Sequence, residues 1–105
     1  MYEIKVLEEY NKLFNKMDTT KQVAINKRLF RIEKDGNLGD YKIIDKDLFE
    51  FRIFSNGGIR IYFTIQNNKN ILLLLNLGFK QSKTEQQKDI NKAKALLNKV
   101  KEVEK

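Results

Sequence analysis

The sequence of 105 residues contains no cysteine, no proline and no histidine. Without cysteine there is no disulfide framework and no sign of export. Without histidine the chain lacks the commonest general acid/base and the commonest zinc ligand, which excludes catalysis by a paired histidine mechanism. The longest apolar run, Ile71 to Leu75, is far shorter than the roughly 20 residues that a membrane span needs. We therefore expect one cytoplasmic domain over residues 1–105, with no membrane partner.

Positive charge is in excess and unevenly spread. The chain has 21 Lys and Arg against 14 Asp and Glu, a net charge of +7. Residues 1–40 carry a net +1 (8 basic, 7 acidic), whereas residues 41–80 (6 basic, 3 acidic) and 81–105 (7 basic, 4 acidic) carry +3 each. Such an excess favours a polyanion or an acidic protein as partner, mainly through phosphate contacts. A soluble lysine-rich surface with no specific partner is the alternative.

The spacing of apolar residues predicts the order of helices and strands. Thr19 with Gln22, and Thr84 with Gln87, have the spacing of a capping box and indicate the starts of two helices. The four strands in mid-chain are joined by links too short for crossover helices, so they should be antiparallel neighbours. We expect an α+β domain: a mostly antiparallel sheet of four to five strands, two N-terminal helices and a C-terminal helix. The predicted strands are 2–6, 41–45, 48–55, 59–66 and 70–77, and the predicted helices are 8–17, 19 to about 34, and 84 onward.

The alternation of side chains restricts the hairpin formed by strands 48–55 and 59–66. Odd-numbered residues are apolar in both strands, so odd positions should oppose odd positions if both strands face one core. A two-residue Asn56-Gly57 turn would break this parity, whereas loops of three or five residues keep it. We expect the three-residue loop 56–58, because it suits a glycine in the left-handed conformation. Arg52 would then lie across from Tyr62, and Arg60 across from Phe54.

The opposite face of this hairpin carries the candidate functional side chains. Arginine is planar, permanently charged and multiply donating, which suits phosphate, and tyrosine can stack on a base. The alternative is a solvated sheet face with an Arg–Tyr cross-strand pair. The residues of this face are Glu50, Arg52, Arg60, Tyr62 and Thr64.

Three segments in order, "LFEFRIFSNGGIRIYF", "ILLLLNLGFKQSK" and "DINKAKALL", give a family resemblance. Together they resemble the RelE/ParE superfamily of small bacterial toxins, above all its phage-derived addiction-module killer branch, which is often grouped with the HigB toxins. The similarity covers about residues 23 to 97. It implies the RelE-like fold, an antitoxin partner that is commonly a small helix-turn-helix protein, and the ribosome and mRNA as targets.

The resemblance also implies an activity and its residues. It implies a metal-independent, cofactor-free endoribonuclease in which a 2′-hydroxyl attacks the neighbouring phosphate while basic side chains stabilise the added negative charge. Which lysine matches a family lysine stays open, because the segment before the last helix does not align without a gap. The implied catalytic residues are Arg52, Arg60, Tyr62, Lys80 and Lys83; the candidates for RNA contact are Lys80, Lys83, Lys88 and Lys92, the last two on what is otherwise a solvated helix face.

Other functions remain open on the sequence alone. ParE members share the fold yet act on DNA gyrase without being enzymes, and a non-toxic basic binding module would carry the same charge. The mid-chain acids have no recognised spacing for metal ligands, so we expect solvated turn acids and no metal. These acids are Asp40, Asp45, Asp47 and Glu50.

Overall fold

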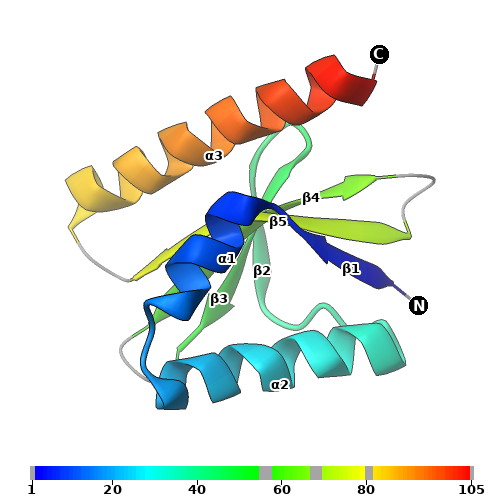
Figure 1. The fold of residues 1–105 in the computed structure, drawn as a ribbon, viewed down its shortest axis with the longest axis vertical. Helices are drawn as coiled ribbons and strands as arrows, with labels where there is room; N and C mark the ends of the chain where they lie inside the picture. Colours follow the sequence, from blue (N-terminus) through cyan, green and yellow to red (C-terminus); the bar gives the residue numbers. More distant parts are fainter. Residues whose placement is uncertain (1, 55–57, 67–69, 80–81, 105) are drawn as a thin grey trace.

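The structure is a computed structural model that describes residues 2–54, 58–66, 70–79 and 82–104. The five predicted strands and three predicted helices are all present, in the predicted order (Figure 1). The elements are β1 (Glu3–Val6), α1 (Glu8–Asn15), α2 (Thr19–Asp35), β2 (Tyr41–Asp45), β3 (Leu48–Ile53), β4 (Ile59–Gln66), β5 (Ile71–Phe79) and α3 (Lys83–Glu104).

One sheet organises the molecule. Its strand order is β1-β5-β4-β3-β2, with antiparallel pairs throughout except that β1 runs parallel to β5. Helices α2 and α3 lie on opposite sides of this sheet (Figure 1). The predicted α+β class, with a mostly antiparallel sheet between N-terminal helices and a C-terminal helix, is confirmed.

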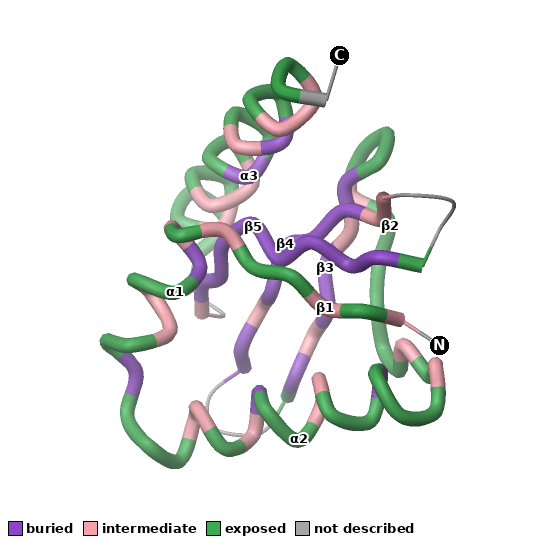
Figure 2. The backbone as a smooth tube through the Cα atoms, turned by 45° about the vertical axis from the view of Figure 1, so that its right-hand side comes forward, coloured by how far each residue is buried: buried purple, intermediate pink, exposed green. Residues whose placement is uncertain are grey.

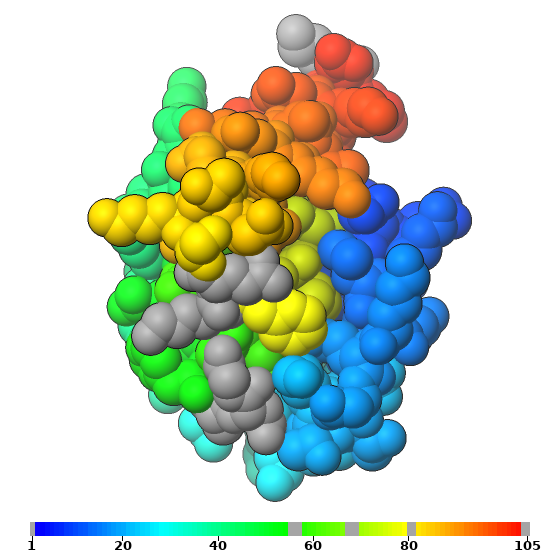
Figure 3. Space-filling view, turned by 90° about the vertical axis from the view of Figure 1, so that its left-hand side faces the viewer, coloured from blue at the N-terminus to red at the C-terminus, as the bar shows by residue number. Residues whose placement is uncertain are grey.

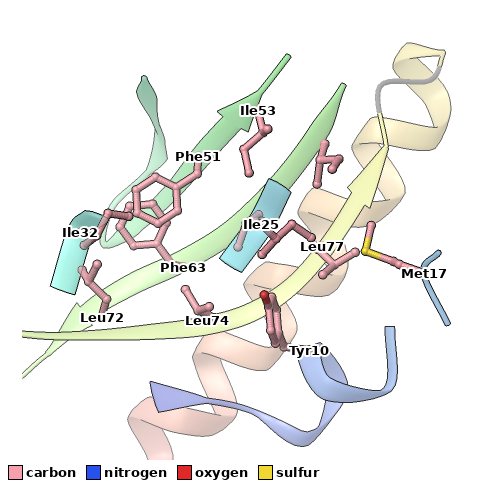
Figure 4. Packing of buried hydrophobic residues seen from close by; sticks show 12 residues of the cluster. Tyr10, Met17, Ile25, Ile32, Phe51, Ile53, Phe63, Leu72, Leu74 and Leu77 are labelled. Atoms are coloured by element: carbon pink, nitrogen blue, oxygen red, sulfur yellow. The ribbon is translucent and has the colours of Figure 1, made fainter. Parts of the chain in front are cut away.

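The main core lies between the sheet and helices α1 and α2. It is built by the odd-numbered residues of β3 and β4, as the alternation predicted, with Phe51 and Phe63 stacked at 3.9 Å between ring centroids. The burial view shows the three central strands buried and the outer side of α2 exposed (Figure 2). Residues of both helices and of the turn between them reach this core, namely Tyr10 of α1, Met17 of the turn, and Ile25 and Ile32 of α2 (Figure 4).

The other face of the sheet is covered in part by α3. Leu48, Leu73 and Leu75 pack there against Ala93 and Leu97 of the helix. The alternative of a wholly solvated sheet face therefore does not hold, because the apolar stripe of α3 is buried against part of it. Among the described residues, no helix is both long and apolar enough to cross a membrane.

The hairpin keeps the predicted parity but not the predicted pairing. Ile53 pairs with Ile59, so the strands are joined by residues 54–58, the five-residue alternative, of which 55–57 lie outside the described residues. Arg52 consequently lies across from Arg60, and Tyr62 across from Glu50. Parity alone cannot separate registers that differ by two residues, because both place the same side chains on the same face.

An ion pair explains which of the two registers forms. With Arg60 opposite Arg52, Glu50 is its diagonal neighbour, close enough for a long side chain, and the guanidinium lies 3.0 Å from the carboxylate. In the expected register Arg60 would lie opposite Phe54, which is four residues along the chain from Glu50. The two side chains would then be too far apart to be diagonal neighbours. Since the Glu50 side chain is fully buried, losing this partner would leave an uncompensated charge inside the protein.

The caps of both long helices lie earlier than the capping-box spacing predicted. Asp18, not Thr19, is the N-cap of α2, and its carboxylate accepts from the backbone N–H of Lys21 at 2.9 Å. At the start of α3 the hydroxyl of Ser82 accepts from the N–H of Glu85 at 3.2 Å, in place of Thr84. In both cases a residue one or two positions before the threonine accepts a hydrogen bond from a free N–H group of the first turn.

Arg28 of α2 holds the loop before β2 and the end of β3 together. Its guanidinium donates to the carbonyl oxygens of Leu38 (2.7 Å), Asp40 (2.6 Å) and Arg52 (3.0 Å). Gly39 has φ +69°, and a Cβ there would lie 2.8 Å from this guanidinium, so both the conformation and the space require glycine. Arg28 thus fixes the backbone that carries Arg52.

Replacing Arg28 with methionine should lower the free energy of unfolding by about 2–4 kcal/mol, because three carbonyl groups lose charge-assisted hydrogen bonds. Arg31→Met is the matched control, since Arg31 is exposed on the same helix and makes no ion pair among the described residues; its effect should stay within about 0.5 kcal/mol. Urea unfolding followed by circular dichroism measures both. Equal effects of the two substitutions would contradict the stabilising role of the Arg28 hydrogen bonds.

Candidate functional site

Two rows of residues cross the three central strands on the face toward α3. The inner row is Glu50, Tyr62 and Asn76, directly opposite one another on β3, β4 and β5. The outer row is Arg52, Arg60 and Gly78, one step closer to the hairpin loop. Figure 3 shows this side of the molecule, with the first residues of α3 (yellow to orange) above the green strand residues. The helix covers the inner row, and the outer row lies at its margin.

The two predicted arginines lie next to each other in the outer row. Both line a hollow of about 140 Å³ together with Phe54, Gly58 and neighbouring strand residues. The side chains are 34% (Arg52) and 16% (Arg60) exposed, so each is partly screened from water but open to a ligand. The hollow is therefore a small cationic site at the end of the sheet.

The two arginines are held very differently. Arg60 donates from Nη1 to Oε1 of the fully buried Glu50, whose other oxygen lies 3.4 Å from the side-chain amide of Gln86 on α3. Arg52 meets Asp40 at 3.4 Å on the surface, and its guanidinium lies 5.6 Å from the Phe54 ring centroid. The Nε groups of both arginines are buried and have no hydrogen-bond partner in the described part of the chain, so an anion would be met by the exposed parts of the two guanidiniums.

Tyr62 is placed differently from the sequence-based expectation. Its side chain is fully buried under α3 in the smaller core, so the ring cannot stack on a base in this structure. Burial first, and then the carboxylates of Glu50 and Asp89, raise the pKa of Tyr62 well above its ordinary value. The phenol is therefore neutral at pH 7 and packs beneath the arginines.

Sequence reasoning missed one acidic residue at this site, Asp89 of α3. A Cβ at Gly78 would lie 2.1 Å from Oδ2 of Asp89, so the carboxylate occupies the space that a side chain at position 78 would fill. The main-chain oxygen of Asp89 accepts from the side-chain amide of Asn76 at 3.1 Å, which fixes the helix over β5. The available signal was Gly78 itself, because glycine within a strand often marks a close approach of another group.

The predicted lysines are only partly brought to the site. Lys80 lies outside the described residues. Lys83 is exposed at the start of α3, near the end of the strands, and forms no ion pair in the described ranges. Lys88 and Lys92 lie further along α3 and pair with Glu85 (3.6 Å) and with Glu9 of α1, respectively. Such exposed pairs are weak and can exchange for a ligand.

The four mid-chain acids are each paired with a basic residue, but Glu50, which was expected to be a solvated turn acid, is instead fully buried on β3. Asp40 pairs with Arg52, Asp45 with Lys94 at 3.4 Å, and Asp47 with Lys101 at 2.8 Å. Within the described ranges, no group of three or more carboxylates could hold a metal ion. The described cationic site is thus built of arginine donors, with carboxylates that position them.

The fold is shared with solved toxin structures. The isolated RelE toxin of E. coli superposes with a TM-score of 0.64 at 16% identity, covering 87% of this chain and 98% of that one. A chain of the RelBE2 toxin–antitoxin complex of Mycobacterium tuberculosis gives 0.62 at 13% identity, covering 75% and 98%. The fold is therefore that of the RelE toxins, as the motif order predicted.

The family follows from the sequence comparisons. Residues 12–98 match the family described as phage-derived protein Gp49-like, and the chain belongs to that family. An uncharacterized protein of Haemophilus influenzae is 34% identical over 95 residues, which is 90% of this chain and 91% of that protein. The expected phage-derived family is confirmed, together with the RelE-like fold that the resemblance implied.

Arg60→Met should destabilise the protein by about 3 kcal/mol, because it leaves the buried Glu50 carboxylate without its charged partner. Arg52→Met, which loses only a surface pair, should cost about 1 kcal/mol or less. Replacing both buried partners, Arg60→Met with Glu50→Leu, should recover most of the loss. Chemical denaturation of the three variants measures this order, and similar losses for both single variants would contradict it.

Proposed function

We propose that this chain is the toxin of a type II toxin–antitoxin pair and that it cuts mRNA on the translating ribosome. The RelE fold and the membership of a phage-derived family support a toxin. The observation that carries the enzymatic proposal is the pair Arg52 and Arg60 beside a hollow of about 140 Å³ at the end of a rigid sheet.

The chemistry of RNA cleavage fits two adjacent guanidiniums. When a 2′-hydroxyl attacks the neighbouring phosphate, negative charge builds up on the non-bridging oxygens, and preorganised donors lower the barrier by stabilising that charge. The guanidinium of Arg60 is anchored by Glu50, so it is oriented before RNA arrives. Arg52, held only by Asp40, can turn to complete the contact. No metal is needed in this scheme.

The remaining predicted residues take supporting roles in this proposal. Lys83 adds positive charge beside the arginines, and Lys80 is assigned to the same role by the resemblance alone. Lys88 and Lys92 would exchange their surface ion pairs for RNA phosphates, with the release of counterions. Tyr62 is fully buried in the inner row, so its role in this proposal is to support the arginines by packing.

The proposed partners are an antitoxin, the ribosome and mRNA. The antitoxin proposal is supported by structural neighbours that were solved as toxin–antitoxin complexes from E. coli and M. tuberculosis. The net charge of +7 favours an acidic protein surface or RNA in general. A neighbouring gene that encodes a small DNA-binding protein able to reverse growth arrest would identify the antitoxin.

Inducing the wild-type protein in bacteria should arrest growth and produce codon-linked cuts in translated mRNA within minutes. Arg52→Gln should relieve the arrest and reduce cleavage by about 100-fold, because one donor to the transition state is lost. Arg31→Gln, an exposed arginine on α2, is the matched control and should remain toxic. Mapping of mRNA 5′ ends after a short induction measures the cuts.

The same experiment separates the alternatives. Gyrase inhibition of the ParE kind predicts intact transcripts with DNA-damage signalling, and a non-toxic binding module predicts unchanged growth. If Arg52→Gln and Arg60→Gln are both folded and both fully toxic, the arginine site is wrongly assigned.

A further inference from the structure

The outer row of the site is completed by a side chain from another element. Gly78 lies directly across from Arg60 and contributes no side chain, and the Asp89 carboxylate fills that space from α3. Opposed Cβ positions on antiparallel strands are about 5 Å apart, and Oδ2 of Asp89 lies 2.1 Å from the Cβ position at Gly78, so this oxygen lies within about 7 Å of the Cβ of Arg60. Read across the sheet, the row is Arg52, Arg60 and then the carboxylate of Asp89.

The Asp89 carboxylate is not neutralised by its neighbours. The guanidinium of Arg60 turns toward Glu50, and no salt bridge to Asp89 forms among the described residues. Its side chain is partly buried in the second turn of α3. Burial first, and then the nearby Glu85, raise the pKa of Asp89, while Lys92 opposes the shift. A raised pKa makes a carboxylate a better proton acceptor once it is ionised.

The other titratable groups that face this point from the strands are less suited to proton transfer. Glu50 is fully buried and already bound to Arg60. Tyr62 is buried, and its raised pKa keeps it protonated near neutral pH. The guanidinium of Arg60 has only donors and no acceptor, so it cannot take up a proton. In the described part of the chain, Asp89 is therefore the partly exposed proton acceptor without a salt bridge in the row of the two arginines, next to Arg60.

We propose that Asp89 is the general base of RNA cleavage in this protein. The 2′-oxygen forms a bond to phosphorus, its proton passes to an Asp89 carboxylate oxygen, and the bond from phosphorus to the 5′-oxygen breaks. The leaving 5′-oxygen takes a proton from water, which gives a 2′,3′-cyclic phosphate and a 5′-hydroxyl. Asp89 then loses its proton to solvent. This inference rests on the proposed endoribonuclease function and adds the residue that replaces histidine.

The first variant is Asp89→Asn, which keeps the size of the side chain and the main-chain hydrogen bond from Asn76. Single-turnover cleavage on programmed ribosomes should fall by about 10²–10⁴-fold, the usual share of a general base. Binding to the ribosome should be unchanged. The wild-type rate should fall as pH drops through the raised pKa of Asp89, because the base becomes protonated, and this acid limb should be absent in Asp89→Asn.

The second variant is Glu85→Gln, which removes a negative charge at an exposed position one turn earlier on α3. Glu85 is one cause of the raised pKa of Asp89, so its neutralisation should lower that pKa. The maximal rate should stay at the wild-type level while the acid limb moves to lower pH. A purely structural Asp89 predicts no movement of the limb.

Gly78→Ala tests the geometry without altering the acid. The added methyl group would meet the carboxylate, whose flexible end must rotate away from the row. Cleavage should fall at least 10-fold while the protein stays folded, and the same substitution made in Asp89→Asn should cause no further loss. Additive losses in this cycle would contradict a shared role.

The outcomes separate this inference from the proposed function. A wild-type protein that leaves RNA intact on translating ribosomes overturns the endoribonuclease, and the general base with it. A wild-type protein that cuts RNA, together with a folded Asp89→Asn that cuts equally well, overturns the general base alone. If Asp89→Asn fails to fold, Glu85→Gln decides. An acid limb at the same pH in Glu85→Gln and in the wild type also overturns the general base.

Discussion

The buried ion pair between Arg60 and Glu50 is the interaction on which the rest of the site depends. It joins β3 to β4, and the contact of the same carboxylate with Gln86 brings in α3. A charge with no solvent exposure is tolerated only where it is paired and hydrogen-bonded, so hairpin register and helix position must both satisfy it. The sheet therefore presents Arg60 in one orientation, whether or not a ligand is bound.

The two arginines would contribute differently to binding an anion, because one side chain is fixed and the other is adjustable. Arg60 is bound to a carboxylate that no ligand can reach, so its direction is fixed in advance. Arg52 is bound to an exposed carboxylate at 3.4 Å, and an incoming phosphate can displace Asp40 at little cost. Arg28 complements this arrangement by holding the main chain of Arg52 while its side chain stays adjustable. A rigid donor beside an adaptable one suits a phosphate whose geometry changes during reaction.

The fold could be predicted from local patterns, because each helix and strand has its own spacing of apolar residues and its own residues that begin and end it. The parity of the hairpin followed from alternating apolar residues, and with it the shared face of Arg52, Arg60 and Tyr62. The start of α3 was predicted at Thr84. The observed start could also have been predicted from the sequence, since Ser82 and Glu85 have the spacing of a capping box.

What could not be predicted depends on contacts between distant elements. The two-residue shift of the hairpin depends on the energy of a buried charge, which alternation does not report. The burial of Tyr62 and the placement of Asp89 depend on where α3 docks, and its apolar stripe alone does not specify that position. Gly78 was visible in the sequence, but its partner was eleven residues away on another element.

The contact between Gly78 and Asp89 has a consequence for how relatives of this protein can diverge. A larger residue at the strand position is compatible only with a shorter one at the helix position, so drift at either position is limited by the other. Relatives that retain the acid should retain the glycine, and a relative with a side chain on the strand would have to supply the lost carboxylate from elsewhere. Paired variation at these two positions would thus sort the family into chains that share this site and chains that have replaced it.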